Sequence, residues 1–142
     1  VVNSKRPERW EEEWIDTLIC NRQESFAGCV DLSRDLDSLR CRQMVVTLGP
    51  GGVFCNLSME PESHERRILR APTLADTVID VTGAGDSFTA GFAYSALRHP
   101  HAVDCSLSKE QAVERWIAEG QIWAAWCCAQ IGCGTPIKAS SF

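Results

Sequence analysis

A glycine-containing turn between residues 80 and 88 holds the residues best suited to chemistry. Its sequence is Asp-Val-Thr-Gly-Ala-Gly-Asp-Ser-Phe, and its second aspartate is Asp86. Where such a turn opens a helix, the first N–H groups lack intrahelical acceptors and, with the helix dipole, form a site for phosphate. A carboxylate in this position can accept a proton from an alcohol. The pattern therefore predicts phosphoryl transfer, which needs an oriented nucleophile and neutralised charge on the moving group.

Each residue of the turn has a separate role in this interpretation. Asp86 is the general base, and the backbone amides expected to form the anion hole are those of Gly83, Ala84 and Gly85. The alternative is that Asp86 only caps the helix, because Asp is common there. Other nucleotide loops fit less well. A Walker A loop needs Gly-Lys-Ser/Thr, and a G-x-G-x-x-G loop would need glycine where Phe88 stands.

Hydrophobic patterns place the turn between a strand and a helix. Residues 77–81 are predicted as a short strand and residues 87–97 as a helix rich in small side chains. A second helix is expected to begin at Lys109, capped by Ser106 or Ser108, and to end near Gly132. Upstream, residues 44–48 and 53–55 are predicted strands on either side of a turn at 49–52. This alternation indicates an α/β fold.

The segment before residue 24 allows two interpretations. Apolar positions within residues 8–19 favour an amphipathic helix, and the alternative is a short strand from Trp14 to Cys20 that leads into Asn21. Asn21 and Glu24 have the spacing of a capping box. Residues 59–70 are polar and predict an exposed loop or a hairpin.

Composition limits the class of protein. The 142 residues suffice for one domain, and the net charge of −5 gives no basic excess for binding nucleic acid. No apolar run is long enough to span a membrane, and the N-terminus lacks a signal-peptide pattern, so a cytoplasmic location is expected. The eight cysteines include no Cys-x-x-Cys pair, which favours free thiols over a disulfide framework or a zinc site.

Three motifs, in order, resemble the ribokinase-like (PfkB) carbohydrate kinase family. Residues 78–91 are similar to its C-terminal signature, Asp-Thr-Thr-Gly-Ala-Gly-Asp-x-Phe, with Val81 in place of a common threonine. Asn21-x-x-Glu24 is similar to the Asn-x-x-Glu motif of the family, and residues 47–52 to its Thr-Leu-Gly-x-x-Gly loop. The resemblance extends from about residue 14 to residue 136 and implies a ribokinase-like α/β/α sandwich.

The resemblance also implies ligands and roles. It implies ATP, Mg²⁺ and a small-molecule sugar or nucleoside substrate, with K⁺ as an optional ion. The residues expected to contact ATP are Thr47, Gly49, Gly52 and Gln121. The residues expected to organise magnesium and phosphate are Asn21 and Glu24. The residues expected to bind the monovalent cation are Asp80, Thr82 and Gly132.

One departure from the family affects the functional expectation. Family members are considerably longer, and most of their sugar-binding residues precede the part that this chain resembles. We therefore expect residues 1–142 to be a single, partial kinase domain that corresponds to the C-terminal, nucleotide-binding part of the sheet. Dependence on an absent N-terminal half, or a homodimer, is expected. The alternative to a kinase is a nucleotide-binding module without catalysis.

Overall fold

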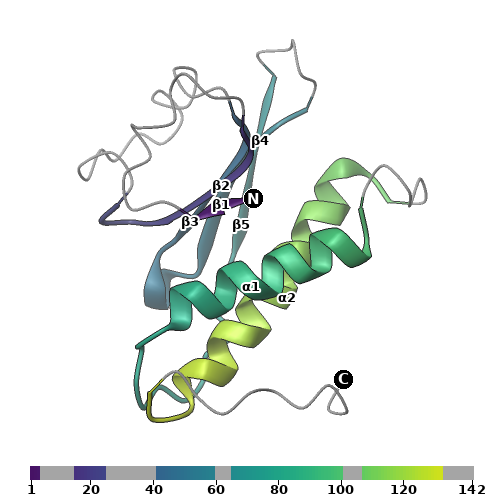
Figure 1. Cartoon of the computed structure of the whole chain (residues 1–142). Coiled ribbons are helices and arrows are strands. Elements are labelled where there is room, and N and C mark those ends of the chain that lie inside the picture. The colour runs from purple at the N-terminus through teal and green to yellow at the C-terminus, as the bar shows by residue number, and fades with distance from the viewer. Residues whose placement is uncertain (4–14, 25–40, 60–64, 101–106, 133–142) are drawn as a thin grey trace.

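The computed structural model describes residues 1–3, 15–24, 41–59, 65–100 and 107–132. Within them, a mixed sheet lies beside two helices (Figure 1). The strands, in their order across the sheet, are β1 (Val2–Asn3), β2 (Ile15–Asn21), β3 (Cys41–Thr47), β4 (Val53–Ser58) and β5 (Arg66–Ala71). The helices are α1 (Ala84–Arg98), α2 (Lys109–Cys128) and the short 3-10 helix η4 (Gly49–Gly51).

The direction of the strands brings three polar residues to one edge of the sheet. β1, β2 and β3 run parallel, whereas β4 and β5 continue the sheet as antiparallel strands. The register pairs Asn21 with Thr47, and it pairs Asn3 with Ile19, which precedes Asn21 on β2. Asn3, Asn21 and Thr47 are the last residues of their strands, so all three lie at the carboxyl edge, where open α/β sheets bind ligands.

The helices cover one face of the sheet and form a core with it. Phe88 and Phe92 of α1 and Val113 and Ile117 of α2 pack with the side chains of β2, β3 and β4 that point toward them, and all four are buried. A second buried cluster, which includes Leu18, lies apart from it. Because β2 and β3 contribute to both clusters, residues along them are buried in succession rather than alternately.

α1 and α2 approach each other closely along their length (Figure 1). A Cβ at Gly91 would lie 2.9 Å from the carbonyl oxygen of Glu119, and one at Gly120 would lie 2.8 Å from that of Phe88. Glycine at both positions therefore permits the contact. The close packing fixes the ends of the two helices relative to each other, and both ends contribute to the site described below.

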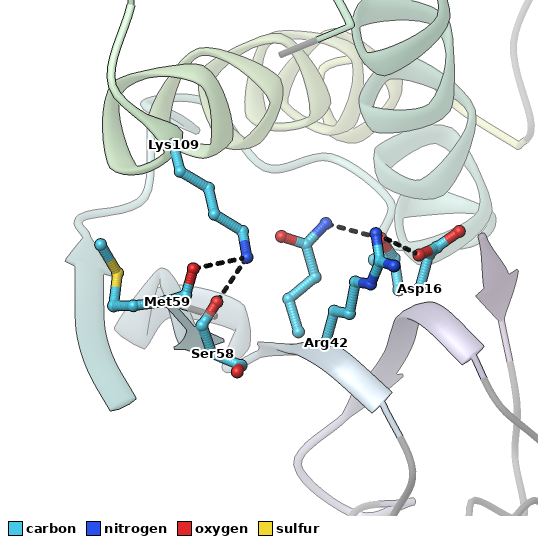
Figure 2. A network of polar contacts seen from close by, with 7 residues as sticks. Asp16, Arg42, Ser58, Met59 and Lys109 are labelled. Atoms are coloured by element: carbon cyan, nitrogen blue, oxygen red, sulfur yellow. Dashed lines mark hydrogen bonds and ion pairs between the residues drawn. The ribbon is translucent and has the colours of Figure 1, made fainter. Parts of the chain in front are cut away.

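The first residue of α2 connects the helix to the edge of the sheet opposite the three polar strand ends. Figure 2 shows Lys109 extending toward the end of β4, where Nζ donates to the carbonyl oxygens of Ser58 and Met59. Nearby, Arg42 forms an ion pair with Asp16 at 3.3 Å (Figure 2). Burial, and then the charges of Arg42 and Arg66, lower the pKa of Lys109. This network positions the start of α2 on the sheet.

Two predicted elements were wrong. The helix predicted over residues 8–19 is replaced, from Ile15 onward, by β2, as the alternative interpretation had it; residues 8–14 lie outside the described part. The apolar spacing there results from burial on both faces of a strand. The strand predicted at residues 77–81 is absent, because the N–H groups of Ile79 and Asp80 donate to the carbonyl of Cys128 instead of to a neighbouring strand.

The expected cap of the second helix is confirmed, because Ser108 caps α2 in a reciprocal capping box with Gln111. β4 and β5 pair as an antiparallel hairpin, so residues 66–70, expected in an exposed loop or a hairpin, belong to β5, and residues 60–64 lie outside the described part.

No helix in the described part of the chain is long and apolar enough to cross a lipid bilayer.

Candidate active site

Two adjoining cavities open at the carboxyl edge of the parallel strands. The first has a volume of about 350 Å³ and is mainly apolar, and the second has about 190 Å³ and is lined by Glu24 and Asp86 among others. Asn21, Thr47 and Gly85 line both cavities and form the wall between them. An elongated ligand could therefore occupy both cavities at once.

The apolar cavity lies between the turn after β3 and the second half of α2. Gly49 and Gly52 line it from the turn, and Gln121 and Cys128 line it from α2. Gln121 is 6% exposed, and its Nε2 has no hydrogen-bond partner among the described residues. A buried amide without a partner costs free energy unless a ligand supplies the acceptor. The cavity therefore offers one oriented donor within an apolar wall.

Gly52 shapes the turn that borders this cavity. Its φ of +83° belongs to the region that favours glycine, and a Cβ there would collide with the carbonyl oxygen of Ala71. The N–H of Leu48 donates to the carbonyl of Gly52 at 2.8 Å, which closes the turn. Only glycine permits this closure, so the sequence Gly-Pro-Gly-Gly sets the shape of the cavity mouth.

Asn21 and Glu24 form the expected reciprocal hydrogen bonds at the polar cavity. The N–H of Asn21 donates to Oε2 of Glu24 at 3.0 Å, and Oδ1 of Asn21 accepts from the N–H groups of Gln23 and Glu24, each at 2.9 Å. The capping-box geometry is thus confirmed. It leaves the Nδ2 donor of Asn21 and the Oε1 acceptor of Glu24 without partners among the described residues.

The turn before α1 presents unpaired N–H groups to both cavities. Gly83 is the N-cap of α1, with φ of +79°, and Asp86 is in the first turn. The N–H of Ala84 donates to the carbonyl of Val81 at 3.1 Å, so it is not available to a ligand. In the described part of the chain, the N–H groups of Gly83, Gly85 and Asp86 donate to no backbone carbonyl. These three groups make an anion site at a helix N-terminus physically sound.

No contact with another described residue requires glycine at position 85. It has helical backbone geometry, and a Cβ built on it would meet no atom within 4 Å. Glycine in a helix is less stable than alanine by about 0.5–1 kcal/mol, so alanine would be the better residue for the helix alone. Because Gly85 lies in the wall between the cavities, its open surface suits the close approach of a ligand.

Asp80 ties the start of the turn to the segment after α2. Its Oδ1 accepts from the N–H and the hydroxyl of Thr82, at 2.9 and 2.7 Å, and its Oδ2 accepts from the N–H of Gly132 at 2.9 Å. The thiol of Cys127 lies 3.4 Å from the carbonyl of Thr82. The hydrogen bonds from Thr82, and then that from Gly132, lower the pKa of Asp80.

The fold gathers the predicted site residues into three groups. The nucleotide-side set lines the apolar cavity: Thr47, Gly49, Gly52 and Gln121. The phosphate-side set lines the polar cavity: Asn21, Glu24, Gly83, Gly85 and Asp86. Asp80, Thr82 and Gly132 meet through hydrogen bonds beside the turn. In the described residues, no three His, Cys, Asp or Glu side chains gather as a metal cluster.

Sequence reasoning missed Asn3. Its Nδ2 lies 3.4 Å from Oδ1 of Asp86, and it lines the polar cavity. A signal for it was present, because Val1-Val2-Asn3 is a short apolar run that ends in asparagine, as β2 does at Asn21.

The sequence matches the model of one known protein family over most of its length. This family is described as pfkB family carbohydrate kinase, and the match covers residues 12–140. The chain belongs to the pfkB family. The ribokinase-like α/β fold predicted from the sequence is thereby confirmed, and solved structures of family members agree with it.

Individual relatives of this pfkB-family chain include enzymes with different acceptors. An ATP-dependent 6-phosphofructokinase of Thermoanaerobacterium thermosaccharolyticum is 36% identical over 85 residues, which are 60% of this chain and 24% of that protein. The nucleoside kinase of Methanocaldococcus jannaschii superposes with a TM-score of 0.62 at 25% identity, over 83% of this chain and 34% of that one. Adenosine kinase from Sinorhizobium meliloti gives 0.63 at 26%, over 86% and 33%. The chain thus spans about a quarter to a third of the length of these relatives.

Proposed function

We propose that this protein takes part in the transfer of a phosphoryl group from ATP to a hydroxyl of a sugar or related small molecule. Asp86 is the general base that accepts the proton of the hydroxyl, and the turn from Gly83 to Gly85 forms the anion hole through the N–H groups of Gly83 and Gly85. Family membership supports a kinase, since the model that matches the chain is one of carbohydrate kinases. The relatives include a 6-phosphofructokinase, a nucleoside kinase and an adenosine kinase, so the proposed acceptor is a sugar or a related small molecule that carries a hydroxyl.

One observation carries the proposal: the wall that the two cavities share. It contains Gly85, whose open surface admits a ligand, and beyond it lies Asp86. A nucleotide with its base in the apolar cavity would direct its phosphates past Gly85 toward that carboxylate. The unpaired N–H groups at this helix start lie where charge develops during transfer. The N–H of Ala84 is excluded from this role because it bonds Val81.

The apolar cavity suits a nucleobase with one polar contact. Gln121 offers an unpartnered Nε2 donor to a ring acceptor, and Gly49 and Gly52 leave space beside it. Binding of a base would satisfy the buried amide and cover the apolar wall, so both contributions favour the nucleotide complex. Thr47, at the end of β3, lines both cavities, so it would lie between the base and the phosphates of a bound nucleotide.

The donor atoms at the polar cavity fit Mg²⁺. Oε1 of Glu24 is a hard oxygen ligand, and Mg²⁺ is commonly held by one or two carboxylates, waters and substrate phosphates. Asn21 would contribute a donor to phosphate through Nδ2 rather than an oxygen to the metal, because its Oδ1 is engaged twice. When bound, Mg²⁺ neutralises charge on the phosphate oxygens.

Asp80, Thr82 and Gly132 fit a monovalent cation less fully. Carboxylate and carbonyl oxygens are suitable ligands, and a carboxylate has about four lone-pair sites. Three hydrogen bonds already engage the carboxylate of Asp80. We therefore propose K⁺ as an addition to this hydrogen-bonded cluster, with the cluster itself holding the turn in place.

A phosphotransfer assay tests the proposal. The protein is incubated with ATP, Mg²⁺ and a panel of sugars, sugar phosphates and nucleosides, alongside the Asp86→Asn variant. Removal of a general base is expected to lower turnover by about 10²–10⁴-fold while ATP binding is retained. The Asp76→Asn variant is the charge-matched control, because Asp76 is exposed and lines neither cavity. Turnover that survives in Asp86→Asn would overturn the assignment of the base.

The same assay separates the kinase from the alternative. ATP binding without transfer to any acceptor would favour a nucleotide-binding module. Because the chain spans about a third of the solved relatives, the assay is also run with the longer reading frame, if one contains this sequence. Dependence on an additional N-terminal half, or on a second copy of the chain, would then be seen as activity that appears only in the longer or the dimeric form.

A further inference from the structure

The end of β1 lies against the proposed catalytic carboxylate. Nδ2 of Asn3 is 3.4 Å from Oδ1 of Asp86, across 83 positions of sequence. Both residues line the polar cavity, and Asn3 does not line the apolar one. Asn3 and Asp86 thus share the polar cavity.

The order of the strands places Asn3 at one edge of the described sheet. β1 is one of the two edge strands of the described sheet, beside β2, and its register with β2 sets Asn3 opposite Ile19. The nucleotide-side residues Thr47, Gly49 and Gly52 lie at the end of β3 and in the turn that precedes β4, on the other side of β2 from β1. Asn3 therefore reaches Asp86 from the strand on the opposite side of β2 from β3.

Resting on the proposed function above, we propose that Asn3 is a positioning residue for Asp86. The amide N–H of Asn3 holds Oδ1 of the carboxylate, which fixes the rotation of the carboxylate plane. Oδ2 is then the oxygen left to accept the proton of the substrate hydroxyl. The carbonyl oxygen of the same amide is available to a second hydroxyl of the acceptor, on the β1 side of the cavity.

The physical argument depends on the geometry of a carboxylate base. A carboxylate rotates readily about its last side-chain bond, so an unrestrained base spends time in orientations that do not face the nucleophile. One donor on one oxygen restrains this rotation and still leaves the second oxygen basic. The bond is at the long end of the hydrogen-bond range, and catalytic hydrogen bonds are often long before substrate binds and shorten afterward.

The charges around the pair are few, which makes the interaction measurable. Among the described residues that line the polar cavity, the charged side chains are Glu24 and Asp86, and Asn3 is uncharged. Asn3→Asp keeps the size of the side chain and places a like charge against Asp86. Asn3→Ala removes the donor without adding charge. Ala118→Glu is the control for added charge, because Ala118 is exposed on α2 and lines neither cavity.

A measurement without turnover comes first. The side-chain amide signals of Asn3 are followed by NMR in the wild type, Asp86→Asn and Asp76→Asn, with Asn3→Ala to assign them. Asp86→Asn removes the charged acceptor, so the Nδ2 proton signals of Asn3 should move toward the position of a solvent-exposed amide. Asp76→Asn should leave them unchanged, because Asp76 is exposed and lines neither cavity. Unchanged Asn3 signals in Asp86→Asn would overturn the proposal; if that variant does not fold, Asp86→Ala decides in the same way.

Kinetics then test the role in transfer. In the active protein, Asn3→Ala should lower kcat about tenfold with the KM for ATP unchanged, because one hydrogen bond to a charged acceptor is worth about that factor. Asn3→Asp, which places a like charge against Asp86, should lower kcat at least as far, and Ala118→Glu should leave it unchanged. A raised KM for ATP with unchanged kcat would instead place Asn3 in nucleotide binding and overturn the proposal. If the wild type transfers no phosphate, the proposed function fails, while the amide signals still decide whether Asn3 holds Asp86.

Discussion

The carboxylate of Asp80 accepts a hydrogen bond from the backbone N–H of Gly132, 52 residues along the chain, at 2.9 Å. Its other oxygen accepts two hydrogen bonds from Thr82. One side chain thus connects the turn before α1 to the segment after α2. The carbonyl of Cys128 adds two further bonds to the same junction, from the N–H groups of Ile79 and Asp80. The two helix ends that border the apolar cavity are therefore held together at one point.

Removal of the charge at this junction should loosen it. In Asp80→Asn, one amide oxygen can replace Oδ1, but the amide nitrogen would face the N–H of Gly132, so donor meets donor. We expect the melting temperature to fall by a few degrees, with Asp76→Asn as the control for lost charge at an exposed position. Thermal unfolding followed by circular dichroism measures this. An equal fall in both variants would show that net charge, rather than the junction, is responsible.

The same junction predicts how the difference depends on pH. The pKa of Asp80 is lowered from its ordinary value of 3.8 by hydrogen bonds in the folded state, chiefly those from Thr82. A lowered folded pKa contributes stability above the ordinary value, and that contribution is lost as the pH falls through the folded pKa. The difference in the free energy of unfolding between wild type and Asp80→Asn should therefore narrow as the pH falls below 3.8 and through the folded pKa of Asp80. A difference that stays constant in acid would contradict this account.

Gly52 and Gly49 offer a matched test of the nucleotide-side turn. Both have positive φ, +83° and +58°, so alanine is strained at each. At Gly52 the new Cβ would also collide with the carbonyl of Ala71, whereas at Gly49 it meets no atom within 4 Å. Gly52→Ala should cost roughly 2–4 kcal/mol in unfolding free energy, and Gly49→Ala about 1–2 kcal/mol. Chemical denaturation checks the order, and a larger loss at Gly49 would contradict it.

Much of the candidate site could be predicted because its parts are local in sequence. The turn from Gly83 to Asp86 is contiguous, and the Asn21–Glu24 pairing spans one helical turn, so type and spacing alone indicated their geometry. The unavailable N–H of Ala84 could not be predicted in this way, since it depends on how tightly the turn closes onto Val81.

The errors have non-local causes. β2 shows helix-like spacing because two different clusters bury its opposite faces, and periodicity does not separate a strand buried on both sides from a helix. Residues 77–81 have the composition of a strand, but the end of α2 supplies their hydrogen-bond acceptor. The contact between Asn3 and Asp86 depends on strand order, which no local pattern contains.

The buried thiols give a prediction about reactivity. The expectation of free thiols is confirmed for Cys20, Cys41, Cys55, Cys127 and Cys128; the other three cysteines lie outside the described residues. Burial raises the pKa of Cys20 and Cys55 to about 12 and that of Cys41 to about 11. Because the thiolate is the reactive form, these three should resist alkylation in the native protein and react on unfolding. Mass spectrometry after labelling with and without denaturant checks this, and fast native labelling of Cys55 would contradict it.

These thiols also predict a loss of stability in alkali. A folded pKa above the ordinary value of 9.0 means that the folded state keeps protons that the unfolded state releases. The contribution of these buried thiols to the free energy of unfolding is then fully present below pH 9.0, and it declines as the pH rises toward the folded pKa. Urea denaturation at increasing pH should show the decline, and Cys55→Ala should make it shallower. An unchanged slope in that variant would assign the decline to other groups.

Gly85 allows stability and ligand binding to be separated by one methyl group. In Gly85→Ala the Cβ meets no protein atom, and alanine is favoured over glycine in a helix, so the free energy of unfolding should rise by about 0.5–1 kcal/mol. The same methyl group would project into the wall shared by the two cavities, where the proposed phosphate approaches the backbone. Affinity for ATP should therefore fall, by about tenfold or more if the methyl displaces one phosphate hydrogen bond to the backbone. Denaturation and calorimetric titration on the same preparation measure the two effects, with Ala118→Gly as the reverse exchange on the exposed face of α2. A variant that is more stable and binds ATP as tightly as the wild type would show that no ligand approaches this glycine, and the anion hole would have to be sought elsewhere.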